Sequence, residues 1–235
     1  MKWVLVLEDS EVDREYLGRV IERLGYKLFL AGSGEEAIQL MGQSLPDTFV
    51  VGEHIPDYDP LTLVRTIKGN RILADTPLLL MTSNNDASFL EKAGEAGFSE
   101  IVYRPISIRE FYTSLEMCLS NNRRLHIRAP MTFPVNVKRE EETASMITYN
   151  FGEGGMYIPT NDPPQGNTEL EVEFNLPGLR NMFNFKSQVV HAQDRDTEEL
   201  PAGMGLKFLD IKPAISMVLR LFMENFLVTR IAMTA

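Results

Sequence analysis

Three arginines stand close together in an otherwise acidic chain. Arg123, Arg124 and Arg128 lie in one short segment, whereas the chain of 235 residues carries a formal net charge of −10. Guanidinium groups form forked hydrogen bonds with phosphate oxygens, bond the O6 and N7 atoms of guanine and stack on purine rings. Because a net-acidic protein disfavours general binding to DNA and to anionic membranes, we expect this cluster to hold a small anion, and we expect neither DNA binding nor membrane insertion.

A glycine-rich segment, NFGEGG, follows at residues 150–155. Asn150 offers an amide suited to the edge of a base, and Gly155 lets the backbone approach a ligand where a side chain would block it. Glycines in this pattern are also typical of an ordinary hairpin turn, and arginine pairs before a domain are commonly solvated. The two segments therefore indicate a binding site only in combination.

A second group of polar residues stands where apolar runs of the first half end. Glu8 and Asp9 follow the first run, and Gly52, Thr82 and Arg104 end or follow three later ones. Grouped carboxylates can hold magnesium, and a further carboxylate can act as the nucleophile that accepts a phosphoryl group. Solvated acids at a helix start are the plainer alternative for Glu8 and Asp9, because the helix dipole favours negative charge there.

The first 120 residues alternate short apolar runs with amphipathic stretches. The apolar runs lie at 3–7, 27–31, 48–52, 77–82 and 100–103, and the helical patterns lie near 11–24, 34–43, 60–69, 86–96 and 107–121. Near-continuous apolar runs are typical of strands covered on both faces, so this alternation predicts a doubly wound α/β domain with a parallel five-stranded sheet. Ligands of such sheets bind at the carboxyl ends of the strands, where the polar group stands.

The second half has a different period. Between residues 131 and 209, short strand patterns separated by Gly, Pro and Asn predict an antiparallel β-barrel or sandwich. From Ile211 the period is helical again, and its apolar face is formed by Ile215, Val218, Leu219, Phe222 and Phe226. We expect this C-terminal helix to close the barrel or to meet a partner. Two domains are therefore expected, at residues 1–120 and 121–235.

Residues 2–120 resemble the receiver domain of two-component response regulators. The run PDTFVVGEHIPDYDP matches the family pattern around its phosphate-accepting aspartate, but Gly52 stands at the acceptor position. The family's lysine is replaced by Arg104 and its switch aromatic is matched only by Ile101, whereas Thr82 and Pro105 are retained. The resemblance implies magnesium-dependent phosphorylation of a carboxylate, which glycine cannot supply. We expect a pseudo-receiver that is not phosphorylated, needs no metal and serves in docking or dimerisation.

The residues next to the acceptor position and at the first strand end leave alternatives to a pseudo-receiver. Glu53 follows Gly52, but we expect it not to reach the same pocket, because successive strand residues point to opposite faces. A retained magnesium role for Glu8 and Asp9 is an alternative. A flavodoxin-like nucleotide site is another, although the anionic first turn at residues 8–11 lacks a glycine loop to cradle a phosphate.

Residues 121–230 resemble the PilZ domain, a bacterial receptor family for cyclic di-GMP. Its pattern RxxxR followed by (D/N)xSxxG is matched in order, and GMGLKF follows at 203–208. The motif positions correspond to Arg124, Arg128, Asn150, Gly152 and Gly155, with Arg123 beside the first arginine. The resemblance implies a flexible arm that wraps over the ligand and a turn at 150–155 that forms its floor. Gly152 replaces the motif serine, so we expect Gly152→Ser to restore a hydroxyl contact and tighten binding.

Together the resemblances imply a non-enzymatic signalling adaptor. It would bind cyclic di-GMP and signal the bound state to a protein partner through the receiver-like domain or the C-terminal helix. The process controlled would be motility, adhesion or exopolysaccharide export. The chain could also form a homodimer. The alternative is a ligand-independent scaffold in which both sites are degenerate. Acidic residues from position 8 exclude a signal-peptide pattern, and no apolar run reaches the ~20 residues of a membrane helix, so a cytoplasmic location is expected.

The remaining candidate residues suggest little chemistry. The three histidines, His54, His126 and His191, are too dispersed for a metal site, although His126 could stack on a ligand held by the arm. The lone Cys118 is expected to pack in a helix. No nucleophile elbow, phosphate-binding loop or zinc-protease motif occurs, so we expect no enzyme.

Overall fold

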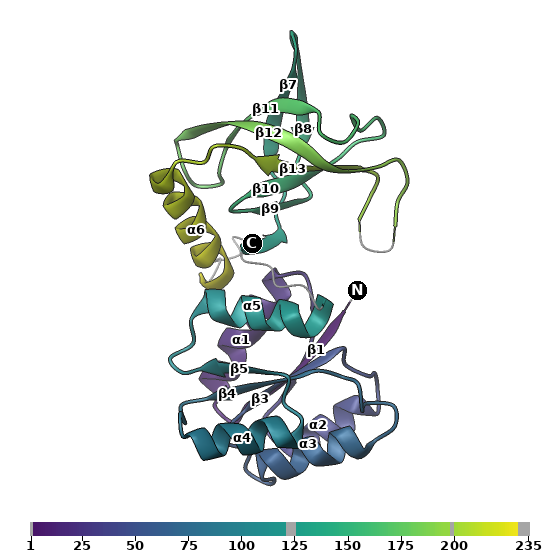
Figure 1. Cartoon of the computed structure of the whole chain (residues 1–235), viewed down its shortest axis with the longest axis vertical. Coiled ribbons are helices and arrows are strands. Elements are labelled where there is room, and N and C mark those ends of the chain that lie inside the picture. The colour runs from purple at the N-terminus through teal and green to yellow at the C-terminus, as the bar shows by residue number, and fades with distance from the viewer. Residues whose placement is uncertain (1, 121–125, 198–199, 230–235) are drawn as a thin grey trace, which may run out of the picture. The chain divides into compact units, whose positions relative to one another are not determined.

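The computed structural model describes residues 2–120, 126–197 and 200–229. The chain divides into two compact units, one formed by residues 1–125 with the chain from residue 227 onward and the other by residues 126–226. Figure 1 shows helices around a parallel sheet in the first unit and a curled antiparallel sheet in the second. Among the helices that the structure describes, none combines the length and hydropathy of a membrane-spanning segment.

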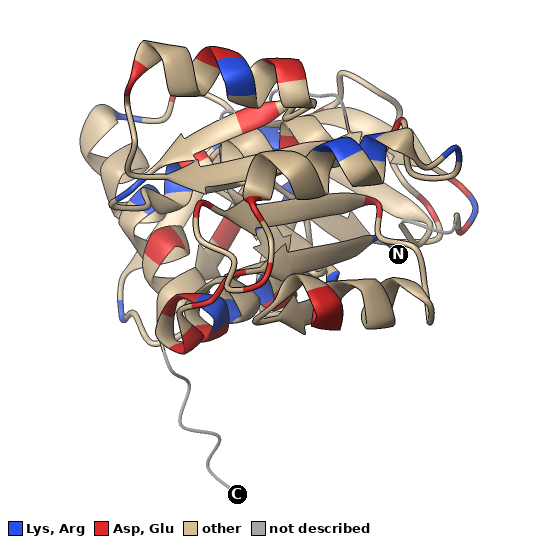
Figure 2. Cartoon of the chain, turned by 90° about the horizontal axis from the view of Figure 1, so that it is seen from below, with Lys and Arg blue, Asp and Glu red and all other residues tan. Residues whose placement is uncertain are grey.

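The first unit is built on a five-stranded parallel sheet with strand order β2-β1-β3-β4-β5. Its strands are β1 (Trp3–Leu7), β2 (Lys27–Ala31), β3 (Thr48–Gly52), β4 (Leu78–Thr82) and β5 (Glu100–Tyr103). The helices are α1 (Glu11–Arg23), α2 (Gly34–Met41), α3 (Pro60–Gly69), α4 (Ala87–Ala96) and α5 (Ile108–Ser120). Charged residues lie mostly on the helices and loops, and the strands carry few (Figure 2). The predicted α/β class is confirmed.

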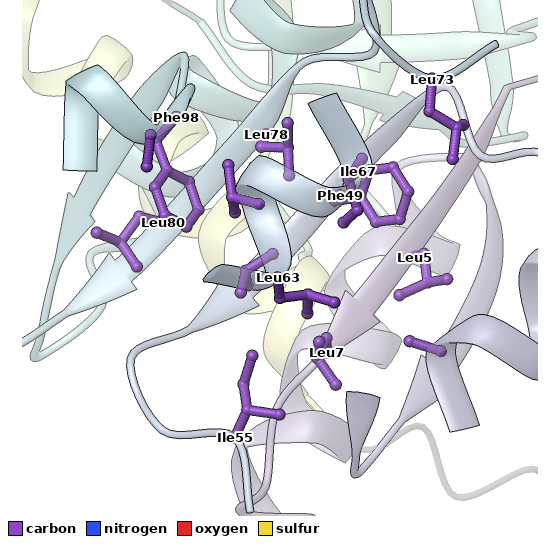
Figure 3. Close-up of a cluster of buried hydrophobic side chains, with 14 of the residues drawn as sticks. Leu5, Leu7, Phe49, Ile55, Leu63, Ile67, Leu73, Leu78, Leu80 and Phe98 are labelled. Carbon is purple, nitrogen blue, oxygen red and sulfur yellow. The ribbon is translucent and has the colours of Figure 1, made fainter. Parts of the chain in front are cut away.

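Local signals and a shared core fix the strand ends of this unit. Ser10 Oγ accepts a hydrogen bond from the Asp13 amide at 3.3 Å, and Ser33 Oγ accepts one from the Glu36 amide at 3.2 Å, so both side chains cap the start of a helix. Figure 3 shows the hydrophobic cluster that joins the sheet to α3. Its members include Leu5, Leu7, Phe49, Leu63, Ile67, Leu78 and Leu80. This packing holds the carboxyl ends of β1, β3 and β4 in register.

The second unit is an eight-stranded antiparallel sheet that curls into a half-barrel. The strands are β6 (Arg128–Pro130), β7 (Pro134–Arg139), β8 (Glu142–Ile147), β9 (Asn150–Gly152), β10 (Gly155–Pro159), β11 (Glu169–Asn175), β12 (Met182–Gln193) and β13 (Gly203–Phe208). Their order is β6-β9-β10-β13-β12-β11-β7-β8, and α6 (Pro213–Val228) follows. The predicted antiparallel class with a C-terminal helix is confirmed.

Phenylalanines fill the inner face of this sheet. Ring centroids of neighbouring pairs lie between 4.5 Å (Phe185 and Phe208) and 6.3 Å (Phe183 and Phe185) apart. The cluster consists of Phe133, Phe151, Phe174, Phe183, Phe185 and Phe208, all of them buried. Because side chains alternate along a strand, the residues between them belong to the outer face.

The structure corrects the expected position of Arg128. The sequence placed Arg128 in a flexible arm, but it begins β6, which pairs with β9 from Arg128 opposite Gly152 to Pro130 opposite Asn150. A strand of three residues gives too short an alternation to be recognised from sequence, and its partner lies more than twenty residues away.

The apolar stripe of α6 is also centred differently from the prediction. Its fully buried residues are Leu219, Met223 and Leu227, spaced four apart, whereas Val218 is exposed. One residue corresponds to about 100° around a helix, so a stripe centred on Leu219 turns Val218 away from it. Ile215, Phe222 and Phe226 flank the stripe and are half-buried.

Candidate functional site

The carboxyl ends of β1 and β3 bring Glu8 and Gly52 together. Glu8 is only 2% exposed. A Cβ atom at position 52 would lie 2.4 Å from Oε2 and 3.2 Å from Cδ of Glu8. The Glu8 carboxylate therefore occupies the space that any side chain at position 52 would need.

Arg104 binds this carboxylate from the end of β5. Its Nη2 donates a hydrogen bond to Oε2 of Glu8 at 2.6 Å, and its Nη1 donates one to Oδ2 of Asp13 at 2.5 Å. Burial raises the pKa of Glu8 to about 7, and the nearby Arg104 charge acts in the opposite direction. Glu8 is thus a buried acid that is paired with the Arg104 cation, and its carboxylate is not free to bind a metal ion.

Glu53 lies at the ends of β3 and β4, contrary to expectation. It accepts a hydrogen bond from the Ser83 amide at 3.0 Å and short hydrogen bonds from the hydroxyls of Thr82 and Ser83. Since β3 ends at Gly52, Glu53 lies beyond the strand, and the alternation of side chains no longer sets its direction. Burial acts to raise the pKa of Glu53, but the hydrogen bonds from Ser83 and Thr82 outweigh it and lower the pKa.

The residues of this pocket do not fit the magnesium ion that a receiver domain implies. Gly52 brings no oxygen ligand, and Glu8 is bound to Arg104. Asp9 is exposed, and its carboxylate accepts a hydrogen bond from the Ser10 amide at 2.9 Å. Within the described ranges, no three His, Cys, Asp or Glu side chains are grouped to hold a metal ion. We therefore assign no metal chemistry to this pocket.

In the second unit, Arg128 of β6 and Asn150 of β9 lie on the same face of neighbouring strands, in diagonal positions. Arg128 lies opposite Gly152, and Gly152 lies opposite Gly155 of β10. Phe151 between the two motif positions is fully buried, so Asn150 and Gly152 belong to the opposite face of the strand, as does Arg128, although Gly152 is itself buried. Arg128 is exposed and Asn150 is half-buried. Arg123 and Arg124, the other arginines expected here, lie outside the described residues.

The two glycines of this face allow close approach of neighbouring backbone. A Cβ atom at Gly155 would lie 2.0 Å from the carbonyl oxygen of Leu206. A Cβ atom at Gly152 would lie 2.6 Å from the carbonyl oxygen of Ile127 and 2.7 Å from Cγ of Arg128. A serine at position 152 would therefore have to displace the backbone of the segment entering β6 and the stem of Arg128 before its hydroxyl could reach a ligand.

The turn between β9 and β10 holds a buried acid that the sequence did not single out. Glu153 is 3% exposed, and its Oε2 lies 3.1 Å from Nδ1 of His126. In the structure, Nδ1 of His126, the histidine that was expected to be able to stack on a ligand, contacts this carboxylate. The contact ties the chain just before β6 to the turn. The sequence did offer a signal for Glu153, because it is an acidic residue that lies between two glycines of the motif.

Comparison with family models divides the chain in the same way. The model of the response regulator receiver domain matches residues 4–116, and the model of the PilZ domain matches residues 122–224.

Curated relatives match the first part of the chain. The transcriptional regulatory protein PdtaR of Mycobacterium tuberculosis is 27% identical over 123 residues, which is 52% of this chain and 58% of that protein. Response regulator MprA of the same species is 28% identical over 116 residues, 49% of this chain and 50% of that protein. The chain thus spans between half and three fifths of the length of these relatives.

Solved structures also resemble about half of the chain. The signal receiver domain of a signal transduction histidine kinase from Syntrophus aciditrophicus is 25% identical with a TM-score of 0.48, covering 53% of this chain and 94% of that one. The chemotaxis response regulator CheY4 of Vibrio cholerae is 19% identical with a TM-score of 0.48, covering 51% of this chain and 99% of that one.

Proposed function

Because the chain consists of a response regulator receiver domain followed by a PilZ domain, we propose that it is a cytoplasmic signalling adaptor that binds cyclic di-GMP and relays the bound state to a protein partner. Both are signalling domains rather than catalytic ones, and PilZ domains form a family that binds cyclic di-GMP. The observation that carries the proposal is that Arg128 and Asn150 lie on the same face of neighbouring strands, with Gly152 directly opposite Arg128.

The chemistry of this face suits a cyclic dinucleotide with guanine bases. The Arg128 guanidinium can fork onto a phosphate or onto O6 and N7 of guanine, and the Asn150 amide can bond a base edge. Gly152 and Gly155 add no side chain to this face, and they let the backbone of the neighbouring strands pack closely beside the motif. Arg123 and Arg124 are proposed to add further forks from the segment that precedes His126.

The receiver domain is proposed to act without phosphorylation. Gly52 has no nucleophile, and Glu8, which fills its space, is bound by Arg104. Incubation of the full chain with acetyl phosphate and magnesium, followed by intact-mass measurement, should show no added phosphate. A phosphate gained by the wild type and lost on replacing Asp9 or Glu53 would contradict this part of the proposal.

The output is proposed to pass through protein contacts of the receiver domain or of α6, with the domain boundary near residue 121. On α6, Met217, Val218 and Leu221 are large apolar residues that are all at least two fifths exposed. Such residues suit a protein partner or a second copy of the chain.

One observation favours the alternative of a ligand-independent scaffold, namely that glycine replaces the motif residue at both sites, at positions 52 and 152. Calorimetric titration of the full chain with cyclic di-GMP separates the two functions. Heat of binding that is lost in Arg128→Ala supports the adaptor, whereas a wild type that gives no heat supports the scaffold.

A further inference from the structure

The register of the second sheet extends the row of residues that begins with Arg128. Arg128 pairs with Gly152, Gly152 with Gly155, and Gly155 with Lys207 of β13. Residues that lie directly opposite one another on neighbouring strands present their side chains on the same face. Arg128 and Lys207 are therefore the two ends of one row on the outer face, and the two residues between them have no side chain.

The surroundings of Lys207 differ from those of the other lysines in this sheet. Lys186 and Lys138 each lie opposite Glu171, a cross-strand arrangement of opposite charges. Lys207 lies between Gly155 and Gln188 instead. It is exposed, and within residues 126–197 and 200–229 neither Lys207 nor Arg128 forms an ion pair. Both cations are thus available to an anion from outside the chain.

The distance along the row suits a ligand with two anionic groups. Neighbouring strands lie about 4.8 Å apart, so the three steps from Arg128 to Lys207 cover about 14 Å between backbones. Both side chains are long and flexible, and the two glycines between them add no side chain to this face, because neighbouring backbone and the stem of Arg128 fill the space that a Cβ atom would take. A ligand lying along this row would therefore meet a cation at each end.

We propose that Lys207 is a further ligand-binding residue, which holds the second phosphate of the cyclic dinucleotide while Arg128 holds the first. This inference rests on the proposed function and names a residue that would bind the second phosphate. A lysine ammonium binds phosphate as a point charge, so its contribution falls as salt rises. Lys207→Arg keeps the positive charge and should retain binding, whereas Lys207→Ala removes the charge and should weaken binding.

The test is titration of the full chain with cyclic di-GMP at two salt concentrations, for the wild type and for single variants. Lys207→Ala should weaken binding about 5- to 20-fold and reduce the dependence of affinity on salt, because one charge-assisted contact is lost. Lys186→Ala is the matched control, since it removes an exposed lysine that lies opposite Glu171, and it should leave the affinity unchanged. Thermal unfolding of each variant shows that the fold is retained.

Three outcomes decide between the inference and the function on which it rests. Weaker binding in Lys207→Ala, with normal binding in Lys186→Ala and Lys207→Arg, supports the inference. Binding that depends on Arg128 but is the same in Lys207→Ala as in the wild type overturns the inference and leaves the proposed function standing. A wild type that does not bind overturns both.

Discussion

Oε2 of Glu8 lies 2.4 Å from the point that a Cβ atom at Gly52 would occupy. The Glu8 carboxylate can therefore lie where it does only because residue 52 has no side chain. Arg104 donates a hydrogen bond to the same carboxylate. The Glu8 carboxylate, bound by Arg104, therefore fills the pocket that would receive a phosphoryl group in a receiver domain.

Enlarging position 52 should destabilise the receiver domain only while Glu8 is present. Gly52→Ala places a methyl group against the Glu8 carboxylate, and we expect a loss of about 2 kcal/mol in the free energy of unfolding. In the Glu8→Ala background the same substitution should cost much less. Urea unfolding followed by the fluorescence of the single tryptophan, Trp3 in β1, reports on this domain.

This double-mutant cycle removes the intrinsic effect of replacing glycine, because that effect is common to both backgrounds. An equal cost of Gly52→Ala in the two backgrounds would show that Glu8 does not occupy the space at position 52.

The stability of the receiver domain should fall as pH rises through about 7. Burial raises the pKa of Glu8 to about 7 in the folded chain, above the ordinary 4.5 of the unfolded chain. The folded state then binds the proton more tightly, so this stabilisation is complete below pH 4.5 and is lost as pH passes about 7. The loss should be on the order of 2 to 3 kcal/mol.

Urea unfolding followed through Trp3 between pH 4.5 and 8.5 measures this dependence. Glu8→Gln should flatten the profile, whereas Glu11→Gln, which alters an exposed glutamate at the start of α1, should leave it unchanged. A Glu8→Gln profile parallel to that of the wild type would rule out titration of Glu8 as the cause.

Much of the receiver fold could be predicted because its strands are long apolar runs. The predicted and observed strands agree to within one residue, and the parallel order correctly placed Glu8, Gly52 and Arg104 at one edge of the sheet. The sequence could not show that Glu8 turns into the space beside Gly52. That direction depends on a missing Cβ atom of a different strand, which no periodicity encodes.

In the second unit, too, the strands could be predicted from the sequence pattern, whereas the contacts that depend on strand pairing could not. Its longer strands follow from their alternation, and the motif residues Asn150, Gly152 and Gly155 fall on a β-hairpin as expected. The strand β6 was missed because pairing with β9, rather than its own three residues, makes it a strand. The crowding at Gly152 depends on that pairing and could not be foreseen.

Replacing Gly152 by serine should weaken cyclic di-GMP binding rather than tighten it. The new Cβ atom would lie 2.6 Å from the carbonyl oxygen of Ile127, so β6 must shift and carry Arg128 with it. Gly154→Ser is the matched control, because a Cβ atom there meets only Cδ2 of His126, at 3.8 Å. We expect a loss of about tenfold or more for Gly152→Ser and little change for Gly154→Ser. Tighter binding by Gly152→Ser would show that the space can accept the hydroxyl.

The central claim is that cyclic di-GMP binds at the face formed by Arg128 and Asn150. Its most direct test is calorimetric titration of the full chain with cyclic di-GMP, with GMP as the control ligand, for the wild type, Arg128→Ala and Asn150→Ala. The account predicts saturable binding by the wild type, affinity lowered by about 10- to 100-fold in Arg128→Ala through loss of a charged fork, and a smaller loss in Asn150→Ala. A wild type that gives no heat at high ligand concentration, or binding that is unchanged in both variants, would contradict it.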